Sequence, residues 1–426
     1  MEDFVTTTRH IASGRMTSFD PGSGAPPPHK PDDLIAIEAA HGANNYHPLP
    51  IVIARARGSW VQDLNGRRYL DMLSSYSALN QGHRHPKVMA ALKAQADRLT
   101  LTSRAFHNDQ LGPFLAKLND IGGFDMALPM NTGAEAVETG IKAVRKWAYQ
   151  KKGVAPGKAE IITASGNFHG RTTTIVGFSS DAQYQDGFGP FTPGFVSVPF
   201  GDAAALESAI TENTAAFLVE PIQAEGGILM PPAGYFEKVR ELCTKHNVLL
   251  FLDEIQTGLG RTGRMFAFEH HGIRPDCVTL GKALGAGVYP VSAFLADREL
   301  MSVFQPGDHG STFGGNPLGA AVASAALDVV VEEKLAERAD RLGTWLMEQI
   351  QEMGSPHVSD VRGAGLLIGV EIKAESGPAR PFCEALMEKG LLCKETHQQV
   401  IRLAPPLTIE QDDLDWALSR LKEALL

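Results

Sequence analysis

Two charged side chains stand where short apolar runs of the sequence end. Lys282 follows the run 277–280, and Asp253 comes directly after the run 248–252. If these runs are neighbouring strands of a parallel sheet, both side chains emerge at its C-terminal edge, where open α/β sheets bind ligands. An amine facing a carboxylate there indicates pyridoxal phosphate, because the lysine can form a Schiff base while the acid partners the ring nitrogen. Either residue alone is usually an ordinary surface charge, so the prediction depends on the pair.

The segment 131–136 fits a phosphate site at the start of a helix. Thr132 and Glu135 have the spacing of a capping box, and Gly133 lets the backbone approach an anion at the positive end of the helix. A plain capped helix explains the same residues, and this segment alone favours that alternative.

The loop 309–317 is a second candidate for phosphate binding. Ser311 and Thr312 stand beside glycines there, and hydroxyl groups suit phosphate oxygens. A loop rich in Gly and Pro is the simpler alternative.

Three glycines spell a dinucleotide-binding pattern, G-x-G-x-x-G, at Gly258, Gly260 and Gly263. That pattern needs a direct turn from strand into helix, yet 253–257 intervenes and 264–272 has weak helical periodicity. No acidic residue ends a second strand at the required distance. We therefore predict that this protein is not a dinucleotide-dependent oxidoreductase.

Composition and charge narrow the classes of protein that fit. The chain has 426 residues, 43% of them hydrophobic, which predicts a large domain plus a smaller one. It contains no apolar run long enough to span a bilayer. A net charge of −10 disfavours nucleic acid or an anionic membrane as the main partner.

Cysteine and histidine spacing indicates neither disulfides nor a metal site. The four cysteines form no C-x-x-C pair, which favours a reducing compartment, and the histidine pairs lack further spaced ligands. Residues 1–34 include a stretch rich in Pro, Gly and Ser, predicting a flexible leader. This leader begins with acidic residues and has no apolar core, so we predict a cytoplasmic protein without a targeting peptide.

From about residue 161, short apolar runs alternate with helical segments, as in an α/β fold with a mostly parallel sheet. Helical stripes are expected at 137–148, ended by Gly153, and at 335–350. A last helix is expected with Thr408 as its N-cap. The alternation of short apolar runs and helical segments changes near Ala325, which predicts a smaller α+β domain after this residue. The expected division is an N-terminal segment 35–75 that joins the small domain, a large domain 76–325 and a small domain 326–426.

Ordered segments along the chain match those of a known family: Asn45-Tyr46-His47-Pro48-Leu49-Pro50, Ser74-Ser75-Tyr76-Ser77-Ala78, Asn131 to Glu135, Asn167-Phe168-His169-Gly170-Arg171-Thr172, Asp253-Glu254-Ile255-Gln256-Thr257-Gly258, Gly281-Lys282-Ala283-Leu284, Gly310 to Pro317, and Ile401-Arg402-Leu403-Ala404-Pro405-Pro406. Through these segments, residues 35–426 resemble the class III aminotransferases, which have fold type I of the pyridoxal-phosphate enzymes. The resemblance implies a homodimer with active sites at its interface, and higher assemblies stay open.

The resemblance assigns roles around the cofactor ring. Lys282 would bind the cofactor and then move the substrate proton, which needs an amine whose pKa is depressed. Asp253 would keep the ring nitrogen protonated, Gln256 would hydrogen-bond the ring hydroxyl, and Phe168 would stack on the ring.

It also assigns the phosphate contacts. Gly133 and Ala134 would offer backbone N–H groups, and the hydroxyls at Ser311 and Thr312 would face the phosphate, with Thr312 reaching it from the other subunit.

For substrates, the resemblance implies transfer of the δ-amino group of L-ornithine to 2-oxoglutarate, giving L-glutamate and L-glutamate 5-semialdehyde. Arg171 would bind the carboxylate far from the reacting carbon, and Arg402 the α-carboxylate of glutamate or 2-oxoglutarate. Glu225 would occupy Arg402 while ornithine reacts, since an unpaired buried guanidinium is costly. Tyr46 and Tyr76 would hold the head group of ornithine.

Two alternatives stay open. His169 is similar to the acetylornithine branch of the family, so transfer from acetylornithine or 4-aminobutyrate is the second reading, although Tyr76 argues against it. A non-catalytic pyridoxal-phosphate protein is the third, and the retained Lys282 argues against that.

Overall fold

The computed structural model describes residues 30–426, so most of the predicted leader lies outside the described part of the chain. The end of that segment differs from the prediction, because helix α1 (Pro31–His41) begins within it. Pro31 at the first helical position has a backbone angle suited to a helix. The backbone N–H of Lys30 donates to Asp33 Oδ2 at 3.3 Å, which satisfies a group at the helix start.

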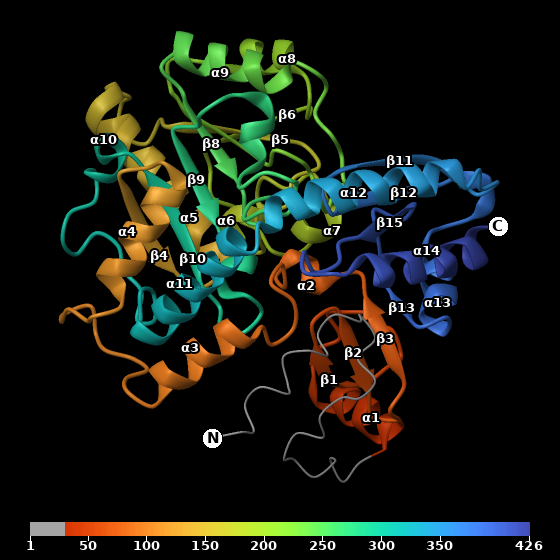
Figure 1. Ribbon diagram of the computed structural model, residues 1–426. Coiled ribbons are helices and arrows are strands. Elements are labelled where there is room, and N and C mark those ends of the chain that lie inside the picture. The colour runs from red at the N-terminus through yellow and green to blue at the C-terminus, as the bar shows by residue number, and fades with distance from the viewer. Residues whose placement is uncertain (1–29) are drawn as a thin grey trace.

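A seven-stranded sheet forms the centre of the large domain (Figure 1), in the order β4-β10-β9-β8-β7-β5-β6. Strand β10 runs antiparallel to both its neighbours, and every other pair is parallel. The predicted α/β class and mostly parallel sheet are confirmed. The strands are β4 (Met126–Met130), β5 (Glu160–Ala164), β6 (Phe195–Val198), β7 (Thr214–Val219), β8 (Leu249–Asp253), β9 (Cys277–Leu280) and β10 (Ser292–Ala296).

Both faces of this sheet are buried, as the continuous apolar runs in its strands require. In β8, Phe251 packs on one face with the apolar stripe of α5 (Gly133–Trp147), while Leu250 and Leu252 pack on the other. Helices α4 (Leu111–Gly122), α9 (Tyr235–Lys245) and α11 (Pro317–Glu332) contribute to that second face. Because successive side chains of β8 point to opposite faces of the sheet, this one strand contributes to two separate hydrophobic clusters.

The C-terminal part forms an antiparallel sheet, β11-β12-β15-β14, against helices α12 (Leu335–Glu352), α13 (Arg380–Glu388) and α14 (Gln411–Leu425). The predicted stripe of α12 is confirmed, since its apolar side chains are buried. The predicted N-cap of the last helix is wrong: α14 is preceded by Glu410, not Thr408. The strands are β11 (Val358–Ala364), β12 (Leu367–Ile372), β14 (Lys394–Thr396) and β15 (Val400–Leu403).

A third sheet pairs an N-terminal ribbon with a short strand from the C-terminal part of the chain. Strands β1 (Ile53–Arg57), β2 (Trp60–Asp63) and β3 (Arg68–Asp71) form an antiparallel ribbon, and β3 pairs in parallel with β13 (Leu391–Leu392). In Figure 1 this ribbon lies below α13 and α14. This pairing supports our proposed assignment of 35–75 to the small domain.

Helix α11 runs through the domain boundary proposed at residue 325. Ala320 and Ala323 pack in the core of the large domain, whereas Val322 and Ala326 pack with α12 and the C-terminal sheet. The two cores therefore share one continuous helix. Within residues 30–426, the remaining elements are α2 (Ser74–Ser77), α3 (Pro86–Ala96), α6 (Thr173–Val176), α7 (Ala182–Gln185), α8 (Ala203–Ala209), α10 (Arg298–Met301), and the short helical turns η1 (Ala148–Lys152), η2 (Ala267–His271), η3 (Lys282–Gly285) and η4 (Ala374–Ser376).

Candidate active site

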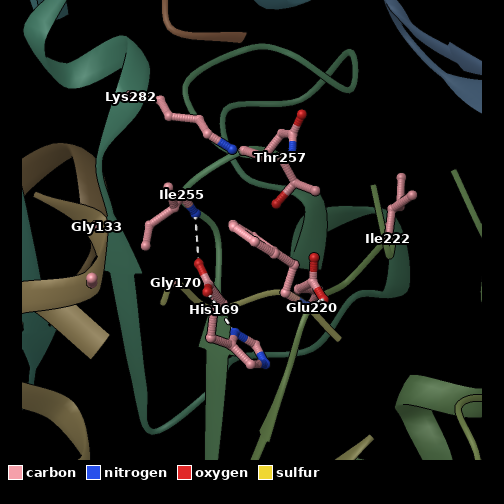
Figure 2. A pocket seen from close by; sticks show the side chains of 12 residues that line it. Gly133, His169, Gly170, Glu220, Ile222, Ile255, Thr257 and Lys282 are labelled. Atoms are coloured by element: carbon pink, nitrogen blue, oxygen red, sulfur yellow. Dashed lines mark hydrogen bonds and ion pairs between the residues drawn. The ribbon is translucent and has the colours of Figure 1, made fainter. Parts of the chain in front are cut away.

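The carboxyl ends of the parallel strands surround a cavity, as the sequence predicts. Asp253 ends β8 and lies opposite Thr279 of β9, and Lys282 follows one short turn later. Figure 2 shows the Lys282 amine directed into this cavity, with His169 on the opposite side. The cavity has an empty volume of about 620 Å3 when the open solvent at its mouth is included. Its lining residues are Gly133, Ala134, Phe168, His169, Gly170, Glu220, Ile222, Asp253, Ile255, Gln256, Thr257 and Lys282.

Asp253 lines the cavity and is held by three hydrogen bonds. Its Oδ2 lies 2.6 Å from His169 Nδ1, and its Oδ1 accepts the backbone N–H of Ile255 at 3.0 Å and the Thr279 hydroxyl at 3.3 Å. Burial alone would lower the pKa of His169, but the hydrogen bond and the charge of Asp253 outweigh it and raise that pKa. The other ring nitrogen, His169 Nε2, is buried without a partner among the described residues.

Glu220 places a second buried acid beside the first. It directly follows β7, is 6% exposed, and its Oε2 accepts the backbone N–H of Phe168 at 3.0 Å. Burial, helped by the charge of Asp253, raises the pKa of Glu220 to about 8 against the opposing effects of His169 and of the hydrogen bond from Phe168. A proton held on Glu220 lowers the cost of burying this acid beside Asp253.

The surroundings of the Lys282 amine lower its pKa. Burial lowers the pKa of Lys282, and the nearby Arg402 charge acts in the same direction against the attraction of Glu225 and Asp253. A larger fraction of neutral amine is therefore present near neutral pH than for an exposed lysine.

The start of α5 lines the cavity through Gly133 and Ala134. The predicted capping box is confirmed: Thr132 Oγ1 accepts the N–H of Glu135 at 3.3 Å, and Glu135 Oε2 accepts the N–H of Thr132 at 2.7 Å. A Cβ atom at Gly133 would lie 2.9 Å from Ile255 Cδ1, so a side chain there would crowd the cavity wall. The glycine leaves the helix N-terminus open to an anion.

Ser311 and Thr312 do not line the cavity of their own chain. Ser311 Oγ instead accepts the side-chain amide of Asn131 at 2.9 Å, and Thr312 is exposed. The structure thus brings the predicted cofactor residues Gly133, Ala134, Phe168, Gln256, Asp253 and Lys282 together, but not these two hydroxyls.

A second cluster of predicted residues lies beside the cavity, around Arg402. This side chain is 1% exposed, and its Nη1 lies 2.5 Å from Glu225 Oε1 and 3.5 Å from Gln256 Oε1. Its guanidinium carbon is 4.7 Å from the centre of the Tyr76 ring, in the geometry of a cation–π contact. Burial would raise the pKa of Glu225, but the charge and hydrogen bond of Arg402 outweigh it and lower that pKa.

Tyr76 is held by an unusual backbone. Ser74 to Ser77 all have positive φ, between 47° and 71°, which is rare for residues with a side chain and costs conformational energy. Asp71 Oδ1 supports this left-handed turn by accepting the N–H groups of Leu73 and Ser74, at 2.9 and 2.8 Å. The strained turn directs the ring of Tyr76 over Arg402.

Arg171 and Tyr46 lie nearer the surface. Arg171 is exposed, and its guanidinium carbon stacks 4.1 Å from the ring centre of Tyr184 and 5.8 Å from that of Phe168. Within residues 30–426 it makes no ion pair, which leaves its donors available to a carboxylate. Tyr46 is 72% exposed.

Sequence reasoning missed several residues of this site. Glu220 follows the apolar run of β7 just as Asp253 ends that of β8, so its position after a strand was a usable signal. In the sequence His169 marks only one branch of the family, because its bond to Asp253 joins distant parts of the chain. Among the described residues, no group of three or more His, Cys, Asp or Glu could hold a metal ion, and no helix is long and apolar enough to cross a membrane.

Comparison with known proteins identifies the family. The family model described as aminotransferase class-III matches residues 41–425. The ornithine aminotransferase of Brevibacillus brevis is 59% identical over 93% of this chain and 98% of its own length, and that of Bacillus subtilis is 58% identical over the same shares.

Solved structures agree with this comparison. The ornithine aminotransferase of Toxoplasma gondii has a TM-score of 0.92 at 45% identity, covering 93% of this chain and 94% of that one. The acetylornithine aminotransferase of Elizabethkingia anophelis has a TM-score of 0.84 at 46% identity, covering 93% and 99%. The family model covers most of the chain, and the relatives match along nearly their whole length. This chain therefore belongs to the class-III aminotransferase family.

Proposed function

We propose that this protein is a pyridoxal-phosphate-dependent ornithine δ-aminotransferase. It transfers the δ-amino group of L-ornithine to 2-oxoglutarate and yields L-glutamate 5-semialdehyde and L-glutamate. The observation that carries the proposal is the closed ion pair of Arg402 and Glu225 under Tyr76, beside an exposed Arg171 without an ion pair within residues 30–426. The carboxylate site at Arg402 is therefore occupied by Glu225, while the site at Arg171 is open. A substrate that reacts at its distal amine needs this arrangement, because its carboxylate then lies far from the reacting carbon.

The residues of the cavity fit pyridoxal phosphate. Lys282 supplies an amine whose pKa is lowered, Asp253 a buried carboxylate for the ring nitrogen, and Gly133 an open helix N-terminus for the phosphate. Phe168 and Gln256 would contact the ring, and Ala134 would add a backbone N–H. When bound, the cofactor supplies an electron sink for the carbon that loses its proton.

The protein then controls one proton and two carboxylates. Lys282 Nζ moves the proton at the reacting carbon, and His169 keeps Asp253 in place through their 2.6 Å bond. Arg171 binds the α-carboxylate of ornithine, and in the other half-reaction the γ-carboxylate of 2-oxoglutarate. Glu225 moves off Arg402 when the α-carboxylate of glutamate or 2-oxoglutarate binds there. Tyr46 and Tyr76 hold the head group of ornithine.

The homodimer is also a proposal. Thr312 is exposed and lies outside the cavity lining of its own chain, which supports a role for its hydroxyl, beside Ser311, in the cavity of a partner subunit. Higher assembly and the cytoplasmic location stay predictions from the sequence.

A second candidate reaction is transfer from acetylornithine, with 4-aminobutyrate as a further ω-amine. The similarity to the Elizabethkingia anophelis acetylornithine aminotransferase, at 46% identity, favours keeping this candidate. The two readings differ in whether the α-amine of the substrate is free or acetylated.

One assay separates these functions. Purified protein with its cofactor is incubated with 2-oxoglutarate and either ornithine, acetylornithine or 4-aminobutyrate, and glutamate formation is measured. With ornithine, o-aminobenzaldehyde traps the cyclised semialdehyde. We expect ornithine to give the highest kcat/KM; faster transfer from acetylornithine or 4-aminobutyrate would contradict the ornithine assignment.

A further inference from the structure

The glycine-rich loop 258–263 packs closely against the β11–β12 turn and helix α12. It joins β8 to η2 through turns, so no strand leads directly into a helix. A Cβ atom on Gly365 would lie 2.5 Å from the backbone nitrogen of Gly263, and one on Gly343 would lie 1.8 Å from the Gly365 oxygen. The loop, the β11–β12 turn and helix α12 therefore touch backbone to backbone, which only glycine permits.

At the centre of this contact lies a completely buried arginine, Arg261. Its Nε and Nη2 donate to Asn80 Oδ1 at 3.2 and 2.6 Å, and its Nη1 donates to the carbonyls of Leu366 and Pro405 at 2.8 and 2.6 Å. Within residues 30–426 it forms no ion pair with a carboxylate. Burial lowers the pKa of Arg261 to about 9, so a cation in this position is costly for folding.

The acceptors of Arg261 belong to the segments that carry the proposed substrate residues. Asn80 follows the left-handed turn that holds Tyr76, and Pro405 follows Arg402 of β15. Leu366 precedes β12, which pairs with β15 so that Gly369 lies opposite Arg402.

The contacts among these segments are reciprocal. The backbone N–H of Leu366 donates to the Arg261 carbonyl at 3.1 Å, and the amide of Asn80 donates to the Leu259 carbonyl at 3.0 Å. The N–H of Leu407 donates to the Asn80 carbonyl at 2.8 Å. One guanidinium thus fixes the spacing between the turn of Tyr76 and the strand of Arg402.

We propose that Arg261 is a positioning residue that holds Arg402 beneath Tyr76 and thereby sets the affinity for the α-carboxylate of glutamate and 2-oxoglutarate. This inference rests on the proposed function. A guanidinium binds a carboxylate through two parallel hydrogen bonds, so a small displacement of Arg402 weakens binding strongly. Ornithine depends less on this position, because Glu225 occupies Arg402 while ornithine is anchored by Arg171.

The test is Arg261→Lys in the holoenzyme, assayed in two ways. An ammonium keeps the charge but cannot reach the acceptors on all three segments at once. Calorimetry measures the binding of glutarate, a dicarboxylate without an amine, and single-turnover absorbance of the cofactor measures reaction with glutamate and with ornithine. We expect glutarate affinity and the glutamate-to-ornithine rate ratio to fall by about tenfold or more.

The matched control is Arg338→Lys. Arg338 Nε and Nη2 also donate to a backbone carbonyl, that of Ile409, and Nη2 pairs with Glu410 at 2.8 Å. We expect this variant to lower the melting temperature without changing the rate ratio or glutarate affinity.

Asn80→Ala is the second variant, which serves if Arg261→Lys does not fold. It removes the side-chain acceptor of Arg261, and we expect the same ratio to fall in the same direction. Equal losses with glutamate and ornithine, together with unchanged glutarate affinity, would overturn the proposal and leave Arg261 a purely structural role. If wild-type protein does not react with ornithine, the proposed function fails, whereas glutarate binding still tests Arg261.

Discussion

Lys282 is the residue on which the proposed chemistry depends most directly. Replacing it in Lys282→Ala removes the amine whose lowered pKa suits it to carry the substrate proton. We expect turnover of ornithine with 2-oxoglutarate to fall by at least ~10³-fold. The control is Lys87→Ala, which removes an amine that pairs with Glu332 on the surface. Near wild-type turnover in Lys282→Ala would show that the assignment is wrong.

Glu225 gives a test of the proposed exchange of partners at Arg402. In Glu225→Ala the guanidinium is permanently open to α-carboxylates, so glutamate should react faster relative to ornithine by about tenfold. The loss of the 2.5 Å pair should also destabilise the protein by up to about 3 kcal/mol, an effect that a bound carboxylate offsets. The measurement is single-turnover absorbance with each amino acid. An unchanged ratio would mean that Glu225 is a fixed structural acid.

At this scale, sequence reasoning works where chemistry follows a strand directly. Asp253 and Lys282 could be found because each stands at the end of an apolar run, and parallel strands bring such ends together. The bond between His169 and Asp253 could not be predicted, because it depends on side-chain directions across separate strands. The family resemblance predicts that Arg402, Glu225 and Tyr76 share one site. Hydrophobic periodicity gives no sign of this, because the three residues lie far apart in the sequence.

Among the elements, helix α12 offers a sharp test of backbone packing. A Cβ atom in Gly343→Ala would lie 1.8 Å from the Gly365 carbonyl oxygen, so helix and turn must separate. We expect a loss of about 3 kcal/mol in the free energy of unfolding, measured by urea denaturation.

The same substitution in helix α4 provides the control for intrinsic helix propensity. A Cβ atom at Gly112 would meet no atom within 4 Å, so Gly112→Ala should stabilise the protein by roughly 0.5–1 kcal/mol. If Gly343→Ala behaves like Gly112→Ala, the close packing of α12 on the turn is wrong.

Helices with a clear hydrophobic repeat or a capping motif could be predicted from the sequence. Elements whose conformation depends on tertiary contacts could not. The stripe and capping box of α5 identified that helix, and Gly153 ends the turn after it with a φ of 83°. The left-handed turn 74–77 carries no glycine, so propensity alone gives no sign of it. Thr408 was expected as a cap on local grounds, yet α14 starts only after Glu410.

For the whole molecule, Glu220 makes stability depend on pH. Burial raises its pKa from 4.5 to about 8, so between these values the folded protein holds a proton that the unfolded chain has released. Stability should therefore be highest below pH 4.5 as far as this group is concerned, and fall as pH rises to about 8. The full effect is on the order of 5 kcal/mol.

Glu220→Gln removes this dependence, because glutamine does not ionise. The unfolding midpoint in urea, measured from pH 5 to pH 8, should fall less with pH in Glu220→Gln than in wild type. Glu348→Gln, at an exposed position of α12, should follow wild type. Parallel curves for Glu220→Gln and wild type would show that Glu220 is already ionised in the folded protein.

The overall architecture was predictable up to the connections between its parts. Alternating runs gave the mostly parallel sheet, and the change of rhythm near Ala325 suggested a boundary. Local sequence does not reveal that α11 crosses that boundary as one continuous helix. Helical periodicity shows which side chains are buried, but not in which of the two cores they are buried. Nor does it reveal the pairing of β3 with β13, which joins distant segments.

That pairing has a consequence for synthesis on the ribosome. Leu70 of β3 lies opposite Leu391 of β13, so the ribbon β1–β3 leaves the ribosome about 320 residues (391 − 70) before its last partner. At about 5–20 residues per second, the exposed edge of β3 waits on the order of tens of seconds for that partner. During this interval the ribbon is a natural substrate for chaperones, and ribosome pausing before residue 391 should increase aggregation of the nascent chain.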